Sequence, residues 1–351
     1  MFRVGMSGEF WNDAGEPCHP VIVDSPLHRE PGVEFVRLPE RETAEADDLV
    51  DVDAFVTMEC SVTSDAIRPD PRLAIVVRGG VGYDDMALDA MARAGVAYAN
   101  APTALSEPVG LAQFTLMLAV MTRLIERVDG ARGGDEAWWR GALMLGSDPR
   151  GKTVGLLGFG GINRVFLRMT GPFDMRAIAW NRSDRSAEMA QVGCEQVDLE
   201  TLFAEADVLA ICLPLNDETH HIVSADRLAL MKPGAIVLNV GRGGLIDEPA
   251  LIEALRAGRI AGAGLDVTQQ EPVEPDNPLL AMPNVVVTPH GLCLSDRCFG
   301  DAIGEALDSV LAVKRGEVPA NLVNTDVSGH PVWIEKLQRH GIAHGQTHQR
   351  S

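Results

Sequence analysis

The sequence predicts an α/β protein made of doubly wound parallel sheets, and three observations lead to this prediction. Short apolar, partly β-branched runs recur along the chain and alternate with helical patterns, which is typical of parallel sheets covered by helices. One of these runs ends in a glycine turn that opens a helix. The length of 351 residues is enough for two domains of ordinary size. We therefore expect two domains, each with its own sheet.

Residues 1–103 predict a small domain of alternating strands and helices. The expected elements are strands at Phe2–Met6, Val33–Leu38, Ala54–Met58, Leu73–Val77 and Gly95–Ala99, and a helix at Met86–Ala94. The fourth strand leads into the glycine loop Gly80-Val81-Gly82, whose backbone N–H groups can cradle an anion. A final helix at Asp296–Lys314 should cross back, so that 292–325 completes a domain split between both chain ends.

Residues 104–291 predict the second domain. Its first helix, Leu105–Arg127, is long and apolar and should bridge the two domains. The loop-rich stretch after it carries Trp138-Trp139, which is either a packed aromatic corner or a contact with a partner subunit. The later elements are expected to be strands at Thr153–Leu157, Met175–Trp180, Val208–Leu213, Ile236–Val240, Ala261–Leu265 and Val285–Thr288, and a helix at Glu248–Ala257.

The segment 326–351 is polar and rich in histidine. His340, His344 and His348 stand four residues apart, which is the spacing of ligands on one helical face. However, 339–351 contains two glycines and little apolar surface. We therefore expect a disordered tail and no metal site.

Composition and charge exclude several kinds of partner. A formal net charge of −20 argues against binding to nucleic acid or to an anionic membrane, because both demand a basic surface. The apolar segment Val109–Met121 contains Gln113 and is shorter than a membrane span, so a buried helix is expected. The six cysteines form no CxxC pair, and the chain starts without the apolar core of a signal peptide. These features predict reduced thiols and a cytoplasmic location.

Residues 152–183 predict the βαβ unit around which the second domain is organised. The first strand ends in Gly158-Phe159-Gly160-Gly161, and a helix should begin at Ile162. A helix N-terminus that faces a glycine turn offers unpaired N–H groups and a partial positive charge, which suits a pyrophosphate. The sequence thus predicts a Rossmann-like, dinucleotide-binding unit, with Asn163 where the full fingerprint has a third glycine.

The end of the second strand bears on the choice of dinucleotide. An Asp or Glu there would bind a ribose 2′-hydroxyl, whereas this chain has Asn181-Arg182-Ser183. These side chains can hold a 2′-phosphate. We therefore expect NADP to be preferred, with NAD also possible.

Three later strands are each followed by one polar residue of a kind that enzymes use in catalysis. Arg242, Glu271 and His290 should converge, because ligands bind at the carboxyl ends of the strands in an open parallel sheet. Arginine can hold a carboxylate bidentately and polarise a neighbouring carbonyl. Histidine can exchange a proton near neutral pH, and a carboxylate beside it favours the imidazolium. The set predicts reduction of a 2-keto acid.

The chain resembles the D-isomer-specific 2-hydroxyacid dehydrogenase family over residues 50–324. The motifs GKTVGLLGFGGI, LPLNDETHHIV, MKPGAIVLNVGRGGLIDEPALIEAL, AGAGLDVTQQEP and NVVVTPH stand in the order of that family. The resemblance implies two Rossmann-like domains, usually in a homodimer, with 104–291 binding the dinucleotide. It also implies an arm around Trp138-Trp139 that reaches the neighbouring subunit.

The resemblance assigns roles to individual residues. Arg242 would bind the carboxylate and carbonyl of the substrate, Glu271 would be the partner of the histidine, and His290 would be the general acid and base. The loop Gly80-Val81-Gly82 would bind the same carboxylate. Contacts with the cofactor would come from Gly158, Phe159, Gly160, Gly161, Ile162, Asn181, Arg182, Ser183, Cys212, Leu213, Pro214, Thr219, Val240, Gly241, Asp266 and His290.

Several functions remain open at this stage. The leading hypothesis is an NADP-preferring reductase of small 2-keto acids, with glyoxylate and hydroxypyruvate as first candidates. Phosphoglycerate oxidation is disfavoured because Glu59, near the expected pocket mouth, would oppose a phosphate, and formate oxidation because that branch has Gln where Glu271 stands. A nucleotide-sensing corepressor of similar sequence is the alternative from another class. Cys212, where many relatives have His, and Thr268, where Phe is common, depart from the family pattern.

Overall fold

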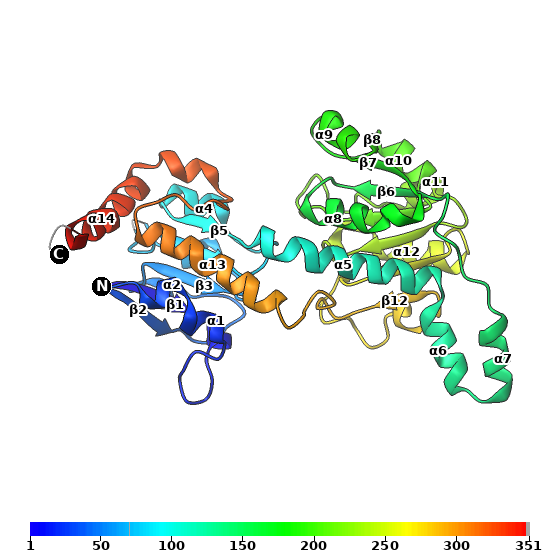
Figure 1. The fold of residues 1–351 in the computed structure, drawn as a ribbon, viewed down its shortest axis with the longest axis horizontal. Coiled ribbons are helices and arrows are strands. Elements are labelled where there is room, and N and C mark those ends of the chain that lie inside the picture. Colours follow the sequence, from blue (N-terminus) through cyan, green and yellow to red (C-terminus); the bar gives the residue numbers. More distant parts are fainter. Residues whose placement is uncertain (70, 349–351) are drawn as a thin grey trace. The chain divides into compact units, whose positions relative to one another are not determined.

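The computed structural model describes residues 1–69 and 71–348, and the side chains of 1–69 and 71–340. The chain divides into two compact units (Figure 1). Unit 1 contains Met1–Leu105 and the described residues from Leu294 onward, and unit 2 contains Ser106–Cys293. Each unit has an open sheet in which all paired strands are parallel.

Unit 1 is assembled from both ends of the chain. Its strands are β1 (Phe2–Met6), β2 (Val33–Arg37), β3 (Ala54–Thr57), β4 (Ile75–Arg78) and β5 (Ala97–Ala99). Its α-helices are α1 (Pro20–Asp24), α2 (Pro26–Arg29), α3 (Ala46–Leu49), α4 (Leu88–Arg93), α13 (Cys298–Lys314) and α14 (Pro331–His348). Short 3₁₀-helices lie at Gly8–Phe10, Ser64–Ala66 and Thr325–Gly329.

The strands of unit 1 follow the order β2-β1-β3-β4-β5. Alternate residues of each strand face opposite sides, so the sheet supports two cores. On β4, for example, Ile75 and Val77 pack with α13, whereas Val76 packs with Met91 of α4. Because both faces are covered, this is the doubly wound arrangement that the sequence predicts.

Unit 2 has the larger sheet. Its strands are β6 (Thr153–Leu157), β7 (Arg176–Trp180), β8 (Cys194–Gln196), β9 (Val208–Ile211), β10 (Ile236–Asn239), β11 (Gly262–Leu265) and β12 (Val285–Val287). Its helices are α5 (Pro102–Met121, which begins in unit 1), α6 (Leu124–Arg132), α7 (Asp135–Leu143), α8 (Gly161–Thr170), α9 (Ser186–Gln191), α10 (Leu199–Glu205), α11 (Ala225–Leu230) and α12 (Glu248–Arg256). The 3₁₀-helices are Gly171–Phe173, Gly243–Leu245 and Pro278–Ala281.

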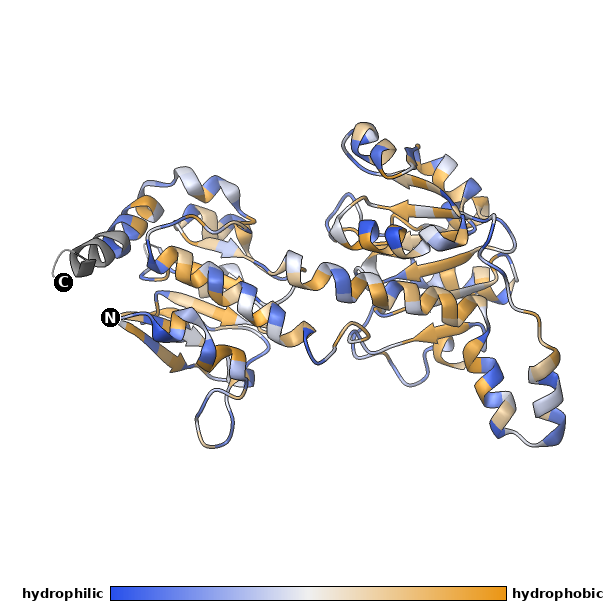
Figure 2. Ribbon diagram, in the orientation of Figure 1, coloured by the Kyte–Doolittle hydropathy of each residue, from blue (hydrophilic) through white to orange (hydrophobic). Residues whose placement is uncertain are grey.

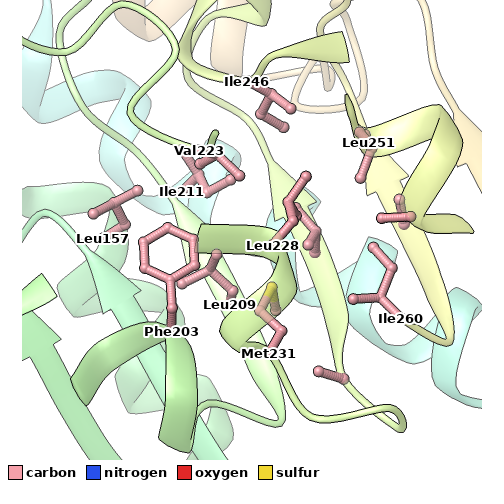
Figure 3. Packing of buried hydrophobic residues seen from close by; sticks show 14 of the residues in the cluster. Leu157, Phe203, Leu209, Ile211, Val223, Leu228, Met231, Ile246, Leu251 and Ile260 are labelled. Carbon is pink, nitrogen blue, oxygen red and sulfur yellow. The ribbon is translucent and has the colours of Figure 1, made fainter. Parts of the chain in front are cut away.

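The strand order of unit 2 is β12-β11-β10-β9-β6-β7-β8. The order reverses between β6 and β9, and a parallel sheet binds ligands at such a switch point, beyond the carboxyl ends of its strands. Figure 3 shows the core on one face of this sheet, where Phe203, Leu209 and Met231 pack together. Hydrophobic residues are concentrated on the strands of both units (Figure 2). The α/β class with two Rossmann-like sheets is therefore confirmed.

Helix α5 fills the other core of unit 2. It is the one helix in the described part of the chain that is long and apolar enough to cross a membrane. Its residues Leu116, Met117 and Met121 nevertheless pack in the protein core. Residue Gly264 of β11 lets it approach closely, since a Cβ there would lie 2.9 Å from the Cβ of Leu116. The segment is the buried helix that the sequence predicts.

The prediction of one helix over Leu105–Arg127 is wrong. The chain breaks between α5 and α6 at Arg123, which has a left-handed φ of 55°. The following loop-rich stretch contains α7, which packs against α6 as a helical hairpin. The backbones can approach at Gly130, where a Cβ would lie 3.2 Å from the Cα of Gly141. Trp138-Trp139 lies on α7 with both side chains more than half exposed, so it is not a packed corner within this chain.

The prediction of a disordered tail over 326–351 is also wrong for the residues that the structure describes. After a 3₁₀-helix, the chain forms α14, whose Trp333 is 1% exposed. The Trp333 Nε1 donates to the carbonyl of Ala74, and the Lys336 ammonium donates to the carbonyls of Leu73 and Gly95. These bonds attach the helix to the beginnings of β4 and β5. The side chains of His344 and His348 lie outside the described residues.

Candidate active site

The glycine turn after β6 is shaped for a close approach of backbone and ligand. Gly158 has φ +95°, and a Cβ on it would lie 2.6 Å from the carbonyl oxygen of Cys212 after β9. The turn can therefore reach the switch point only with glycine there. In contrast, a Cβ on Gly160 would meet no atom within 4 Å, so space is open beside the turn. Gly161 then begins α8, whose N-terminal N–H groups favour an anion.

Asn163 does more than replace the third glycine of the fingerprint. Its side chain is fully buried, and its Nδ2 donates to the carbonyl oxygens of Gly158 at 2.7 Å and Leu157 at 3.3 Å. These bonds hold the carbonyls of the turn inward, against the sheet. The amide thus supplies by hydrogen bonding the tight strand-to-helix packing that glycine supplies by its small size.

The end of β7 supports the same turn. The Oδ1 atom of Asn181 accepts from the N–H of Phe159 at 3.3 Å, and its Nδ2 donates to the Oγ of Ser183 at 3.0 Å. The exposed Arg182 forms an ion pair with Glu218 at 3.2 Å. The structure therefore brings these three predicted residues together beside the glycine turn.

Two further arginines lie at this end of the sheet, and the sequence reasoning missed both. Arg185 donates to the carbonyl of Phe159 at 3.2 Å, and the guanidinium of Arg164 stands 5.5 Å from the centre of the Phe159 ring. Glu188 lies 3.7 Å from Arg164 and 3.3 Å from Arg185, and Glu218 pairs with Arg182, so carboxylates accompany all three arginines. The sequence indicated Arg185 at least, because it stands only three residues after Arg182.

The loop after β9 closes the other side of the turn. Cys212 and Leu213 both lie near Gly158, so they contact the turn directly. Burial raises the pKa of the Cys212 thiol to about 12, so this cysteine remains an uncharged side chain at neutral pH. The Thr219 hydroxyl donates to the carbonyl of Pro214 at 2.7 Å, so it holds the shape of the loop.

Arg242 follows β10 and the buried residues Val240 and Gly241. The Arg242 side chain donates to the Gly241 carbonyl at 2.9 Å. Its neighbour Gly243 packs directly on the next loop, since a Cβ there would overlap the carbonyl of Thr268. This contact fixes the Arg242 loop against the loop that carries Glu271.

The predicted histidine–carboxylate pair is formed. His290 Nδ1 and Glu271 Oε2 are 2.7 Å apart, and the other carboxylate oxygen accepts from the Thr268 N–H at 3.0 Å. An ionised carboxylate can only accept, so Nδ1 carries the proton and Nε2 faces away from the pair. His290 itself has a left-handed φ of 48°.

Electrostatics in the pair favour an imidazolium facing a carboxylate. The hydrogen bond that His290 donates to Glu271 raises the pKa of His290, against the opposing effects of burial and of the Arg242 charge. Burial pushes the pKa of Glu271 upward, but its hydrogen bonds with His290 and Thr268 outweigh this, and the pKa is lowered. Arg242 influences both groups, so the three predicted residues share one electrostatic environment.

Asp266 holds the histidine loop in place. Its Oδ1 accepts from the Thr288 hydroxyl at 2.6 Å and from the N–H groups of Gly291 and Leu292 at 3.2 Å, and its backbone carbonyl accepts from the His290 N–H at 2.8 Å. The buried Asp266 therefore positions His290 through its backbone. Its other oxygen has no partner among the described residues and is left to accept from a ligand.

The Gly80-Val81-Gly82 loop lies in unit 1, after β4. All three carbonyls are bound by the protein: that of Gly80 accepts from the Ala101 N–H at 2.9 Å, that of Val81 from Asn100 Nδ2 at 2.7 Å, and that of Gly82 from Arg78 and Tyr98 at 3.4 Å. For the three N–H groups we find no acceptor among the described residues. Such a row of N–H groups is suited to an anion.

Comparisons with known proteins agree with this arrangement. A model of the NAD binding domain of D-isomer specific 2-hydroxyacid dehydrogenases matches residues 114–291. A glyoxylate reductase from Korarchaeum cryptofilum is 36% identical over 279 residues, which cover 79% of this chain and 84% of that one. The chain belongs to the D-isomer specific 2-hydroxyacid dehydrogenase family.

Other members of the family are similar at the same level. Glyoxylate/hydroxypyruvate reductase B from Pectobacterium carotovorum is 40% identical over 271 residues, covering 76% of this chain and 83% of that one. The structure of an NADPH-dependent glyoxylate/hydroxypyruvate reductase from Sinorhizobium meliloti, in complex with NADP and malonate, has a TM-score of 0.78 and 29% identity, over 92% of this chain and 96% of that one. This dehydrogenase is therefore a nicotinamide-dependent 2-hydroxyacid oxidoreductase.

Proposed function

We propose that the protein is an NADP(H)-preferring reductase of small 2-keto acids, with glyoxylate and hydroxypyruvate as first candidates. The observation that carries the proposal is the 2.7 Å pair of His290 and Glu271 beside Arg242, at the strand ends that flank the glycine turn. The names of the relatives support the same substrates. Glu59, exposed after β3 in unit 1, would repel a substrate phosphate, which disfavours phosphoglycerate.

Each of the three residues has a distinct task in the proposed reduction. The Arg242 guanidinium binds the substrate carboxylate and polarises the neighbouring carbonyl. When bound, the nicotinamide supplies the hydride that the carbonyl carbon accepts. His290 Nε2 gives its proton to the carbonyl oxygen, which becomes the hydroxyl. The Glu271 carboxylate keeps the imidazole protonated until that step and fixes its orientation.

The residues of unit 2 fit a dinucleotide. The open space beside Gly160 and the N-terminus of α8 would take the pyrophosphate, and the free oxygen of Asp266 would accept from the nicotinamide carboxamide. The oxidised or reduced cofactor would contact Cys212 after β9 and Val240-Gly241 after β10. Thr219 acts indirectly, because its hydroxyl holds the loop.

The preference for NADP rests on the end of β7. A carboxylate at any of positions 181–183 would repel a 2′-phosphate, and this chain has none there. Arg182 can pair with the phosphate, while Asn181 and Ser183 can donate to it. Because Arg182 is exposed and its Glu218 pair is on the surface, exchanging this partner for a phosphate costs little.

An exchange of residues tests the cofactor preference. The variant Asn181→Asp with Arg182→Ala should favour NADH, with a change of about 10- to 150-fold in the ratio of kcat/KM values, since a charged hydrogen bond contributes about 1.5–3 kcal/mol. The matched control is Arg176→Ala, which removes an exposed, carboxylate-paired arginine at the other end of β7. Equal use of both cofactors by the wild type would contradict the proposed preference.

Assembly and location are further parts of the proposal. The hairpin of α6 and α7 exposes Leu124, Ile125, Leu143 and the Trp138-Trp139 pair. Such a patch favours a homodimer. All six cysteines are free thiols, which favours a reducing, cytoplasmic location.

A substrate panel with both cofactors tests the activity itself. We expect purified protein to oxidise NADPH with glyoxylate or hydroxypyruvate. Binding of NADPH without turnover of any 2-keto acid would instead favour the corepressor-like alternative, in which nucleotide binding controls recruitment of a partner.

A further inference from the structure

Arg78, the last residue of β4, lies under the Gly80-Val81-Gly82 loop. Its side chain is 8% exposed and forms a two-bond ion pair with Asp85, with Nη1–Oδ1 at 2.6 Å and Nη2–Oδ2 at 2.7 Å. The same two nitrogens also reach backbone carbonyls. Nη1 donates to Gly82, and Nη2 donates to Glu59 and Cys60 after β3, each at 3.4 Å.

One guanidinium therefore connects the ends of two neighbouring strands. It binds the loop after β3, the loop after β4 and a carboxylate beyond the second loop. Only a planar group with several N–H donors can make this set of contacts at once. Gly80 packs against its aliphatic part, since a Cβ there would lie 3.2 Å from the Cγ and Cδ of Arg78.

The direction of these bonds determines what the loop offers to a ligand. Arg78 and Tyr98 hold the Gly82 carbonyl, and Asn100 holds the Val81 carbonyl, so the peptide oxygens are turned into the protein. A carbonyl shares its peptide unit with the N–H of the next residue, and the two point in opposite directions, so the N–H groups of Gly82 and Tyr83 are turned outward. The conformation that binds an anion thus depends on the donors beneath it.

We infer that Arg78 is a positioning residue for substrate binding. By fixing the Gly82 carbonyl it turns the N–H of Tyr83 outward, beside the N–H groups of the Gly80-Val81-Gly82 loop, to receive the carboxylate of a 2-keto acid. This inference rests on the proposed function of the protein as a 2-keto acid reductase. Arg78 does not itself bind the substrate. Its two terminal nitrogens are occupied, its Nε is buried, and Asp85 neutralises its charge.

The test is Arg78→Lys, which keeps the charge but offers one nitrogen in place of the fork. The KM for glyoxylate should rise by about 10-fold or more, a change of about 1.4 kcal/mol, while the dissociation constant of NADPH stays within about twofold. Binding of oxamate, a stable carboxylate analogue of a 2-keto acid, should weaken by the same factor in calorimetry with NADPH present. Asp85→Asn should raise KM by a smaller factor, and the double variant should lose less than the product of the two effects.

Arg72→Lys is the matched control. Arg72 forms the same kind of two-bond pair with Asp53, at 3.0 and 2.7 Å. It precedes β4, however, and so lies at the amino end of the strand, whereas Arg78 lies at the carboxyl end. We expect it to lower the melting temperature and to leave the KM for glyoxylate unchanged. An unchanged KM in Arg78→Lys, or an equal rise in Arg72→Lys, would overturn the inference.

The two proposals fail in different ways. If the wild type turns over no 2-keto acid, the proposed function is wrong. Calorimetry with oxamate still measures whether the loop binds a carboxylate and whether Arg78→Lys weakens that binding. If the wild type is active but Arg78→Lys binds oxamate as tightly as the wild type, the positioning role alone is wrong. Should Arg78→Lys fail to fold, the Asp85→Asn variant decides by the same measurements.

Discussion

The substitution Glu271→Gln removes the charge from the histidine pair and preserves its shape. Gln is nearly the same size as Glu, and its amide oxygen can still accept from His290 Nδ1, which lies 2.7 Å from the carboxylate in the wild type. The variant therefore separates the effect of charge from the effect of position. Its consequences follow from the direction of the pKa shift of His290.

The carboxylate raises the pKa of His290, so the imidazole stays protonated to higher pH than an ordinary histidine. Keto-acid reduction uses the protonated form, so the rate should be constant at low and neutral pH and fall as pH rises through that pKa. Without the charge, the fall moves to lower pH. At pH above the pKa of both proteins the variant should be slower by about 10- to 150-fold, because a hydrogen bond between charged groups contributes about 1.5–3 kcal/mol.

Initial rates of glyoxylate reduction with NADPH, measured across the neutral and alkaline range, check this prediction. The control is Glu274→Gln in the same loop, an exposed carboxylate whose partner is Gln270. It should leave the pH profile unchanged, and both variants should bind NADPH like the wild type. If the descending limb of Glu271→Gln coincides with that of the wild type, the pair does not set the protonation of the catalytic histidine.

Three other changes test different parts of the molecule. Arg242→Lys keeps the charge but loses the planar fork, so KM should rise and kcat should fall in steady-state assays, and an unchanged kcat/KM would exclude the carboxylate clamp. Alanine at both positions of Trp138-Trp139 should weaken the dimer in analytical ultracentrifugation, and intact dimers with unaltered keto-acid selectivity would exclude a subunit contact. Trp333→Ala should lower the free energy of unfolding by about 3–5 kcal/mol in thermal or denaturant unfolding, because the side chain is buried at 1% exposure, and a change below about 1 kcal/mol would show that α14 adds little to unit 1.

Local patterns in the sequence were sufficient for the elements that position the site. The strands β1 and β6 have the predicted bounds, because each is an apolar run that ends at a clear turn signal. The three polar residues at strand ends could be grouped without coordinates, since parallel strands of one sheet end at the same edge. The 2.7 Å contact of His290 and Glu271 follows from this topology and from no feature of either residue alone.

The errors have physical causes of two kinds. The break at Arg123 carries no glycine or proline, and the feature that the structure adds there is the ion pair of Arg123 with Glu126. The tail was misjudged because its composition is polar on average. A narrow stripe was nevertheless present, with Trp333 and Leu337 one turn apart and both buried. The average composition of the segment hides such a stripe, whereas the spacing of its apolar residues reveals it.

The two segments that would bind anions must both act at short range. The protein carries a net charge of −20, so long-range attraction does not favour a carboxylate or a pyrophosphate. Under the Gly80-Val81-Gly82 loop, Arg78 holds the Gly82 carbonyl inward. In the turn after β6, Asn163 holds the Gly158 carbonyl, while the N–H of the same peptide unit, that of Phe159, donates to Asn181, so the N-terminus of α8 is what remains for an anion. The N–H groups are then presented at short range, where their effect depends on geometry more than on net charge. Binding should accordingly be sensitive to the donor that lies under the loop and insensitive to a similarly paired arginine elsewhere in the sheet, and this is the distinction that the comparison of Arg78→Lys with Arg72→Lys measures.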